Sequence, residues 1–378
     1  MRGRGKTRLL LLIILLVGLE MVGTGRALRA EVEAGVAAEV ISRAQNGGAK
    51  EQSTLGQMYY HGEGVDQNYV EAVKWWIRAA AQGDADAQRN LGVSYAFGEG
   101  VGQDYAQAVK WYSKAAEQGD AKAQFNLGVM YERGQGVKQS YEEAVKWYTL
   151  AALQGDADAQ RNLGVNYATG EGVTRDYKET VKWWTRAAEQ GNTEAQFDLG
   201  VMYDRGEGVV QNFKEAVRWY AMAAENGDPM AQVNLGMRYS IGKGVEKNYP
   251  EAVKWYTLAA QKGDAKAQFN LAGMCYSGQG IEQNYYAAYV WASLAAARSE
   301  PSAAKNRDAA ADHLSTKELA EAQELATRFN LWIEQSAPKG EPPVIPGSIS
   351  KSGGAPVASE VKKPAAKPTR KAKKRGKK

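Results

Sequence analysis

The sequence predicts an all-α protein: an α/α solenoid, or superhelix, of seven 36-residue helix-turn-helix repeats, followed by a capping helix pair and a disordered tail. Three features of the 378-residue chain recur every 36 residues, which is typical of repeat architectures. A Leu-Gly pair, Leu-Ala in the last copy, begins at Leu55, Leu91, Leu127, Leu163, Leu199, Leu235 and Leu271. A tryptophan recurs at Trp75, Trp111, Trp147, Trp183, Trp219, Trp255 and Trp291. A Gly-x-Gly pair begins at Gly62, Gly98, Gly134, Gly170, Gly206, Gly242 and Gly278.

Repeat three shows how each unit is expected to fold. Gly119 ends the preceding helix and Asp120 caps the next one, because glycine adopts positive φ freely and aspartate accepts from the first backbone N–H groups. The first helix, helix A, is predicted from about residue 121 to 133, where Gly134 ends it. The second, helix B, is predicted over about residues 141–154, with apolar residues at i, i+3, i+4, i+7 and i+11 on one face.

Glycine and tryptophan positions predict how the helices pack. Gly128 lies in mid-helix, where glycine costs about 1 kcal/mol relative to alanine, so we expect a close approach of the two helices there. One hairpin cannot bury its apolar face alone, and stacked neighbours are therefore expected to share a core. The recurring tryptophans are expected in that core. Trp76 and Trp184 replace a tyrosine of other copies and are expected to be partly exposed.

The first 30 residues resemble a signal peptide. Four basic residues precede Leu9–Leu19, an uncharged run of signal-peptide length that is too short to span a bilayer comfortably. Cleavage is expected after Ala30, and an uncleaved leader would act as a weak membrane anchor. Residues 31–43 then lead to the repeats, which occupy 44–300. We expect an exported protein, periplasmic or associated with the cell envelope.

The C-terminal region departs from the repeat. Residues 301–336 break the period but still predict helices at 303–311 and 316–334, as expected for a cap. Residues 337–378 are rich in Pro, Gly, Ser and Lys and are expected to be disordered.

Charge is unevenly distributed. The net charge of +5 combines +5 in residues 1–30, −10 in residues 31–336 and +10 in residues 337–378. Such a tail favours anionic partners. Outside the cytoplasm these would be an anionic envelope surface, such as lipid or cell-wall polymer, or the acidic repeats themselves. Inside the cell the alternative is nucleic acid, which the leader argues against.

Residues for catalysis are scarce. The chain has one cysteine, Cys275, which is expected to fill core space, and two histidines, His61 and His313, which lie far apart in a linear array. This pattern predicts no metal site and no Ser-His or Cys-His centre. The Gly-x-Gly pairs lie between helices rather than after a strand, which favours turns over nucleotide binding. We expect no enzyme activity and no cofactor.

The motif in residues 120–148 carries a family resemblance. It reads Asp-Ala-x-Ala-Gln-Phe-Asn-Leu-Gly-Val-Met-Tyr-x-x-Gly-x-Gly-Val and then Tyr-x-x-Ala-Val-Lys-Trp-Tyr. This pattern resembles the Sel-1-like repeat family, relatives of tetratricopeptide repeats. The resemblance implies a scaffold or adaptor for partner proteins, often in bacterial envelope regulation. Some secreted relatives with a cysteine pair in each repeat are linked to β-lactamase activity; with Cys275 alone, this chain departs from that subgroup.

Comparison of the seven copies suggests where a partner binds. On helix A the variable positions lie two residues before the repeat leucine and two, five and six after it, which places them on one helix face. By analogy with tetratricopeptide repeats, this face would line a concave groove that holds an extended peptide or a partner's helix, with Phe as anchors and Arg pairing with acidic groups. Unconstrained drift on a solvated surface is the alternative. The candidate residues are Arg89, Phe97, Phe125, Glu132, Arg133, Arg161, Phe197, Asp204, Arg205 and Phe269.

Overall fold

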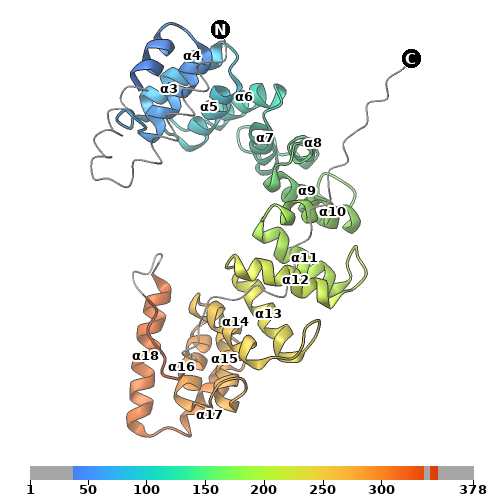
Figure 1. Cartoon of the computed structure of the whole chain (residues 1–378), viewed down its shortest axis with the longest axis vertical. Coiled ribbons are helices and arrows are strands. Elements are labelled where there is room, and N and C mark those ends of the chain that lie inside the picture. The colour runs from blue at the N-terminus through green and yellow to red at the C-terminus, as the bar shows by residue number, and fades with distance from the viewer. Residues whose placement is uncertain (1–36, 336–340, 348–378) are drawn as a thin grey trace, which may run out of the picture. The chain divides into compact units, whose positions relative to one another are not determined.

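The computed structural model describes residues 37–335 and 341–347, and every regular element in them is a helix (Figure 1). The chain forms two compact units, which divide between Asn192 and Thr193. Unit 1 contains a helical segment at 37–45, then α3 (Ala49–His61), α4 (Tyr69–Ala81), α5 (Ala85–Phe97), α6 (Tyr105–Glu117), α7 (Ala121–Arg133), α8 (Tyr141–Leu153), α9 (Ala157–Thr169) and α10 (Tyr177–Glu189). Unit 2 contains α11 (Thr193–Arg205), α12 (Phe213–Glu225), α13 (Pro229–Ile241), α14 (Tyr249–Gln261), α15 (Ala265–Ser277), α16 (Tyr285–Ala297), α17 (Ala303–Ala311) and α18 (Thr316–Glu334).

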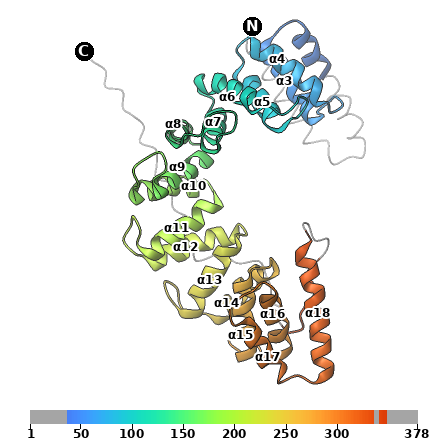
Figure 2. The same cartoon turned by 180° about the vertical axis from the view of Figure 1, so that it is seen from behind.

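Within each unit the helices follow one another as antiparallel pairs, as both views show (Figure 2). The odd-numbered helices α3 to α15 are the helices A of the seven repeats, and the even-numbered helices α4 to α16 are the helices B. The predicted seven-repeat α/α solenoid fold is confirmed, as is the helical pair after the last repeat.

The caps act as the sequence predicts. The Asp120 carboxylate accepts a hydrogen bond from the backbone N–H of Ala123 at 2.7 Å, and α7 begins at the next residue. Gly134 ends α7 with φ of 66°, a conformation that costs glycine little. Ser140 caps α8 in the same way, accepting from Glu143 at 3.2 Å. The helix boundaries of repeat three therefore follow from its capping residues.

The mid-helix glycine is explained by close approach, as predicted. A Cβ atom added at Gly128 would lie 2.6 Å from the ring of Tyr148, the second aromatic residue of helix B. In repeats one and four that second aromatic is tryptophan, and the prediction that Trp76 and Trp184 are partly exposed is wrong, since they are 3% and 7% exposed. Each ring fills the space above its glycine and donates its indole N–H to a helix-A carbonyl, at 3.2 and 3.0 Å.

Repeat seven supports this interpretation. Ala272 stands where the other repeats have the mid-helix glycine, and Ala292 stands where they have the second aromatic residue. Both alanines are buried. The methyl group of Ala272 thus occurs in the one repeat that has no ring at the second position, as the close approach requires. The recurring tryptophans are buried from Trp183 onward, whereas Trp75, Trp111 and Trp147 are half-buried.

Neighbouring repeats meet through a second glycine. Gly136, with φ of 72°, lies so close to the preceding helix B that an added Cβ would stand 2.3 Å from the carbonyl group of Tyr105. Gly100, Gly172, Gly244 and Gly280 meet the preceding repeat in the same way. This glycine thus closes the turn and also permits stacking.

A buried glutamine also joins neighbouring repeats. Gln124 of α7 donates from Nε2 to the carbonyl oxygen of Ala116 in the preceding helix B, at 3.0 Å. Its Oε1 accepts from Gln154, the C-cap of its own helix B, at 2.8 Å. The Nε2 contact recurs with Gln52, Gln88, Gln160, Gln232 and Gln268. Gln124 therefore bridges three helices of two repeats, and its five counterparts share at least the contact to the preceding helix.

The ends of the described chain differ from expectation in two places. Residues 37–45, expected mostly as a lead-in, are helical, and Gln52 binds the carbonyl oxygen of Ala44 as its counterparts bind a preceding helix B. Residues 341–347, within the tail expected to be disordered, have a defined position because Ile345 is buried in the core of unit 2. The predicted leader and the remaining tail lie outside the described residues. None of the described helices is long and apolar enough to cross a membrane.

Candidate partner-binding surface

The candidate residues share one face of helix A, which we call the helix-A face. It comprises four rows, L−2, L+2, L+5 and L+6, numbered from the repeat leucine. The structure divides the ten candidates by exposure. Phe97, Arg133 and Arg205, all in the L+6 row, are exposed. The half-buried candidates are Arg89, Phe125, Glu132, Arg161, Phe197, Asp204 and Phe269.

The phenylalanines of the L−2 row pack against buried tyrosines of helix B. The Phe125 ring lies 5.8 Å from the ring of Tyr148, and the Phe197 ring lies 6.0 Å from that of Tyr220. These tyrosines are the rings that cover the mid-helix glycines. The two phenylalanines therefore hold the tyrosines in place, and only part of each ring remains for a partner.

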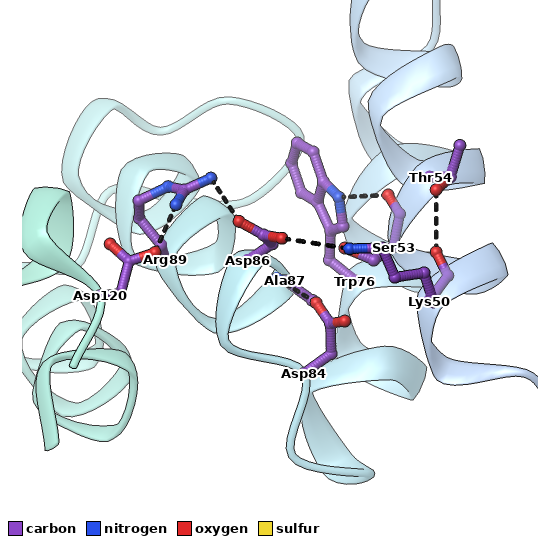
Figure 3. A network of polar contacts seen from close by, with 9 residues as sticks. All are labelled: Lys50, Ser53, Thr54, Trp76, Asp84, Asp86, Ala87, Arg89 and Asp120. Carbon is purple, nitrogen blue, oxygen red and sulfur yellow. Dashed lines mark hydrogen bonds and ion pairs between the residues drawn. The ribbon is translucent and has the colours of Figure 1, made fainter. Parts of the chain in front are cut away.

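Arg89, in the same row, is the centre of a polar network that links three repeats (Figure 3). Its guanidinium lies 2.5 Å from the Asp120 carboxylate, which caps α7, and 3.0 Å from Asp86. Asp86 in turn lies 3.9 Å from the Lys50 ammonium of α3. Because these groups satisfy Arg89, its main role is to join repeats. Arg161 has the equivalent place in repeat four, and its carbonyl oxygen accepts from Trp184.

Acidic residues of the L+5 row are also paired within the protein. Glu132 accepts a hydrogen bond from the hydroxyl of Tyr148 at 2.7 Å, and Asp204 lies 2.5 Å from the Arg238 guanidinium of the next repeat. Burial, and next the Glu132 carboxylate, raise the pKa of Tyr148, so that its hydroxyl remains the donor. Both carboxylates are therefore already engaged by neighbouring helices.

The L+6 row is exposed in every repeat. Phe97 in unit 1 is 71% exposed and Ile241 in unit 2 is 54% exposed. In α13, Val233, Met237 and Ile241 follow one another at i, i+4 and i+8 and form an apolar stripe. Sequence reasoning missed Met237 and Ile241, although Ile241 has the L+6 position of Phe97, Arg133 and Arg205 and Met237 has the variable L+2 position. The row consists of His61, Phe97, Arg133 and Thr169 in unit 1, and of Arg205, Ile241 and Ser277 in unit 2.

Groups that could support chemistry are few in the described part of the chain. No cluster of three or more His, Cys, Asp or Glu residues in residues 37–335 and 341–347 is placed to hold a metal ion. Burial raises the pKa of the Cys275 thiol to about 12, so the thiol is protonated at neutral pH. Cys275 is fully buried and fills core space, as predicted.

Known proteins share this repeat. The Sel1 repeat matches seven successive segments, at residues 52–84, 85–120, 121–156, 157–192, 193–228, 229–264 and 265–299. A Sel1 repeat protein from Oxalobacter formigenes is 38% identical over 65% of this chain and 96% of its own, with a TM-score of 0.55. A protective antigen of uropathogenic Escherichia coli with an SLR fold is 31% identical over 79% of each chain, with a TM-score of 0.40. None of the curated proteins matches. With seven matched repeats over most of its length, the chain belongs to the Sel1 repeat family.

Proposed function

We propose that this chain is an exported interaction scaffold that holds an apolar segment of a partner protein on the exposed L+6 row of its helix-A face, joined in α13 by Met237 of the L+2 row. Sel1 repeat proteins are generally protein-interaction scaffolds, and the helical repeat fold presents a surface rather than a catalytic centre. One observation carries the choice of face. The L+6 row differs between repeats, is exposed in all of them and carries large apolar residues, Phe97 and Ile241, that the core does not use.

The apolar residues suit a helix or an extended peptide. In unit 2, the spacing of Met237 and Ile241 places two exposed side chains one helical turn apart, which matches the apolar stripe of an amphipathic partner helix. In unit 1, Phe97 offers one aromatic anchor of the kind that contributes most at interfaces. Arg133 and Arg205 are exposed cations in the same row and would pair with acidic groups of the partner.

The half-buried candidates have an indirect role in this proposal. Arg89, Phe125 and Phe197 contact other repeats or the core, so they shape the face and leave the anchoring to the L+6 row and to Met237. Replacing them would disturb stacking as well as binding. An informative test therefore changes only exposed residues.

A chain carrying Phe97→Asp, Met237→Asp and Ile241→Asp is expected to lose its partner. Removing the anchors and adding charge should reduce recovery of crosslinked partner by at least about tenfold, which corresponds to about 1.4 kcal/mol of binding free energy. The measurement is crosslinking with mass spectrometry in cells that produce the chain, with circular dichroism to check helix content.

The matched control carries Leu153→Asp, Val210→Asp and Leu331→Asp. These side chains are also apolar and exposed, but none of them lies on a helix A. The control should retain the partner. Equal recovery with both triple variants would reject the helix-A face as the binding surface.

Export is the second part of the proposal and rests on the leader. The basic start and the uncharged run Leu9–Leu19 should direct residues 1–45, fused to a phosphatase active only outside the cytoplasm, across the membrane. Leu12→Arg with Leu15→Arg should abolish the phosphatase activity, because two charges interrupt the apolar run. Equal activity of the two fusions would contradict export. Outside the cytoplasm, the ten basic residues of 362–378 would meet anionic lipid or cell-wall polymer instead of nucleic acid.

A further inference from the structure

A short segment after the last helix is seated on unit 2. Residues 341–347 read Glu-Pro-Pro-Val-Ile-Pro-Gly. Ile345 is 2% exposed, whereas its neighbour Val344 is 74% exposed. Ile345 belongs to the same core cluster as Trp291 of α16 and Phe329 of α18. One side chain of the segment is therefore inserted into the protein while the next points to solvent.

A polar contact fixes the same segment. Asn284 is the N-cap of α16, and its side-chain oxygen accepts from the backbone N–H of Ala287 at 2.8 Å. Its Nδ2 donates to the carbonyl oxygen of Pro346 at 3.0 Å. The Asn284 side chain thus caps α16 with its oxygen and holds the segment with its nitrogen.

The composition of the segment suits a docked ligand. Pro342, Pro343 and Pro346 fix φ at three of seven residues, so the free segment has fewer conformations to lose when it docks. Proline also lacks an N–H, which lowers the number of backbone donors that must find partners at the surface. Pro342 and Pro343 are half-buried and add to the contact.

From these contacts we propose that the last repeat and α18 form a peptide-binding site whose resident ligand, in cis, is this chain's own segment 341–347. The site recognises a proline-rich segment through one inserted aliphatic side chain, at Ile345, and through the carbonyl oxygen of Pro346 on Asn284. The residues that carry this site, Asn284, Ile345 and Pro346, are not in the four rows of the helix-A face, and neither proposal depends on the other. Its occupation sets the point from which the rest of the basic tail continues.

The test compares full-length chains with Ile345→Asp and Val344→Asp. The probe is a fluorescein-labelled synthetic peptide with the sequence of residues 341–347, followed by fluorescence polarisation. The Ile345→Asp chain should bind the peptide at least about tenfold more tightly than the unchanged chain, because its own segment no longer occupies the site. The Val344→Asp chain should behave like the unchanged chain, and a peptide with Asp at the Ile345 position should not bind.

Hydrogen exchange supplies a second readout that does not depend on peptide affinity. Amides at the start of α16 should exchange faster in the Ile345→Asp chain and remain unchanged in the Val344→Asp chain. If the Ile345→Asp chain keeps its helix content but binds no peptide, the recognition site is rejected. A dimer of the unchanged chain that Ile345→Asp converts to monomer would overturn docking in cis and assign the ligand to a second copy.

Discussion

Gly200→Ala is expected to lower the free energy of unfolding of unit 2 by about 2 kcal/mol, although alanine favours helix more than glycine does. A Cβ at this position would lie 2.5 Å from the ring of Tyr220, so the ring or the helix must move. Tyr220→Ala alone should cost about 4 kcal/mol, since it empties a buried site. The double variant should cost no more than Tyr220→Ala, because the added methyl group then meets no ring.

The coupling of about 2 kcal/mol between the two changes is the decisive quantity, and urea unfolding followed by circular dichroism measures it. Gly273→Ala is the matched control. Gly273 also lies within a helix A of unit 2, but an added Cβ meets nothing within 4 Å. This change should therefore stabilise the unit by up to about 1 kcal/mol. If the costs of Gly200→Ala and Tyr220→Ala were additive, the cost of the added methyl group would not come from its contact with the Tyr220 ring. That result would contradict close approach as the reason for the glycine.

The sequence predicted the fold well because its local and long-range signals agree. Asp120 and Gly134 mark the ends of α7 by their own chemistry, and the 36-residue period shows which segments are equivalent. Trp76 and Trp184 were wrongly predicted to be partly exposed, because the replacement of tyrosine by tryptophan at this position was interpreted as a lack of packing constraint. The mid-helix glycine of the same repeat carried the missing information, since it reserves space for whichever ring stands opposite.

The candidate surface was predicted only in part. Variation between copies identified the helix-A face, but it does not distinguish an exposed residue from one that meets the next repeat. Arg89 and Phe125 have the same variable L−2 position in successive repeats. Arg89 bridges repeats through Asp120, whereas the Phe125 ring packs against Tyr148. These contacts depend on how successive hairpins stack, which periodicity alone does not give. The burial of Ile345 was missed because a lone aliphatic residue among prolines has no periodicity to reveal it.

Gln124→Glu should have the other large effect, a loss of about 3 kcal/mol in the free energy of unfolding at pH 7. The buried Gln124 side chain must donate to the carbonyl oxygen of Ala116, and a carboxylate has no hydrogen to donate. It would place a negative charge against that oxygen in a site closed to water. The hydrogen bond from Gln154 would still be available and would offset only part of this cost. Thermal or urea unfolding of the variant and the unchanged chain measures the difference.

The pH dependence of that difference tests the mechanism. Burial beside a carbonyl oxygen raises the folded-state pKa of the introduced carboxyl above its unfolded value of about 4.3, so the folded state binds the proton more tightly. The deficit should therefore be largest at neutral pH and shrink as pH falls through the raised pKa, because a protonated carboxyl can donate to Ala116 again.

The control is Gln154→Glu, at the residue that donates a hydrogen bond to the Oε1 atom of Gln124. Gln154 is exposed, and Asn226, Lys262 and Arg298 replace it in later repeats, whereas the buried glutamine is present in all seven. The control should cost less than about 1 kcal/mol and show little change with pH, because water can solvate its charge. A deficit for Gln124→Glu that stays constant from pH 7 to about pH 5 would mean that the carboxyl also reaches solvent. The glutamine would then be a surface contact, and the joint between repeats would rest on the other contacts, such as the close approach of Gly136 and the ion pair of Arg89 with Asp120.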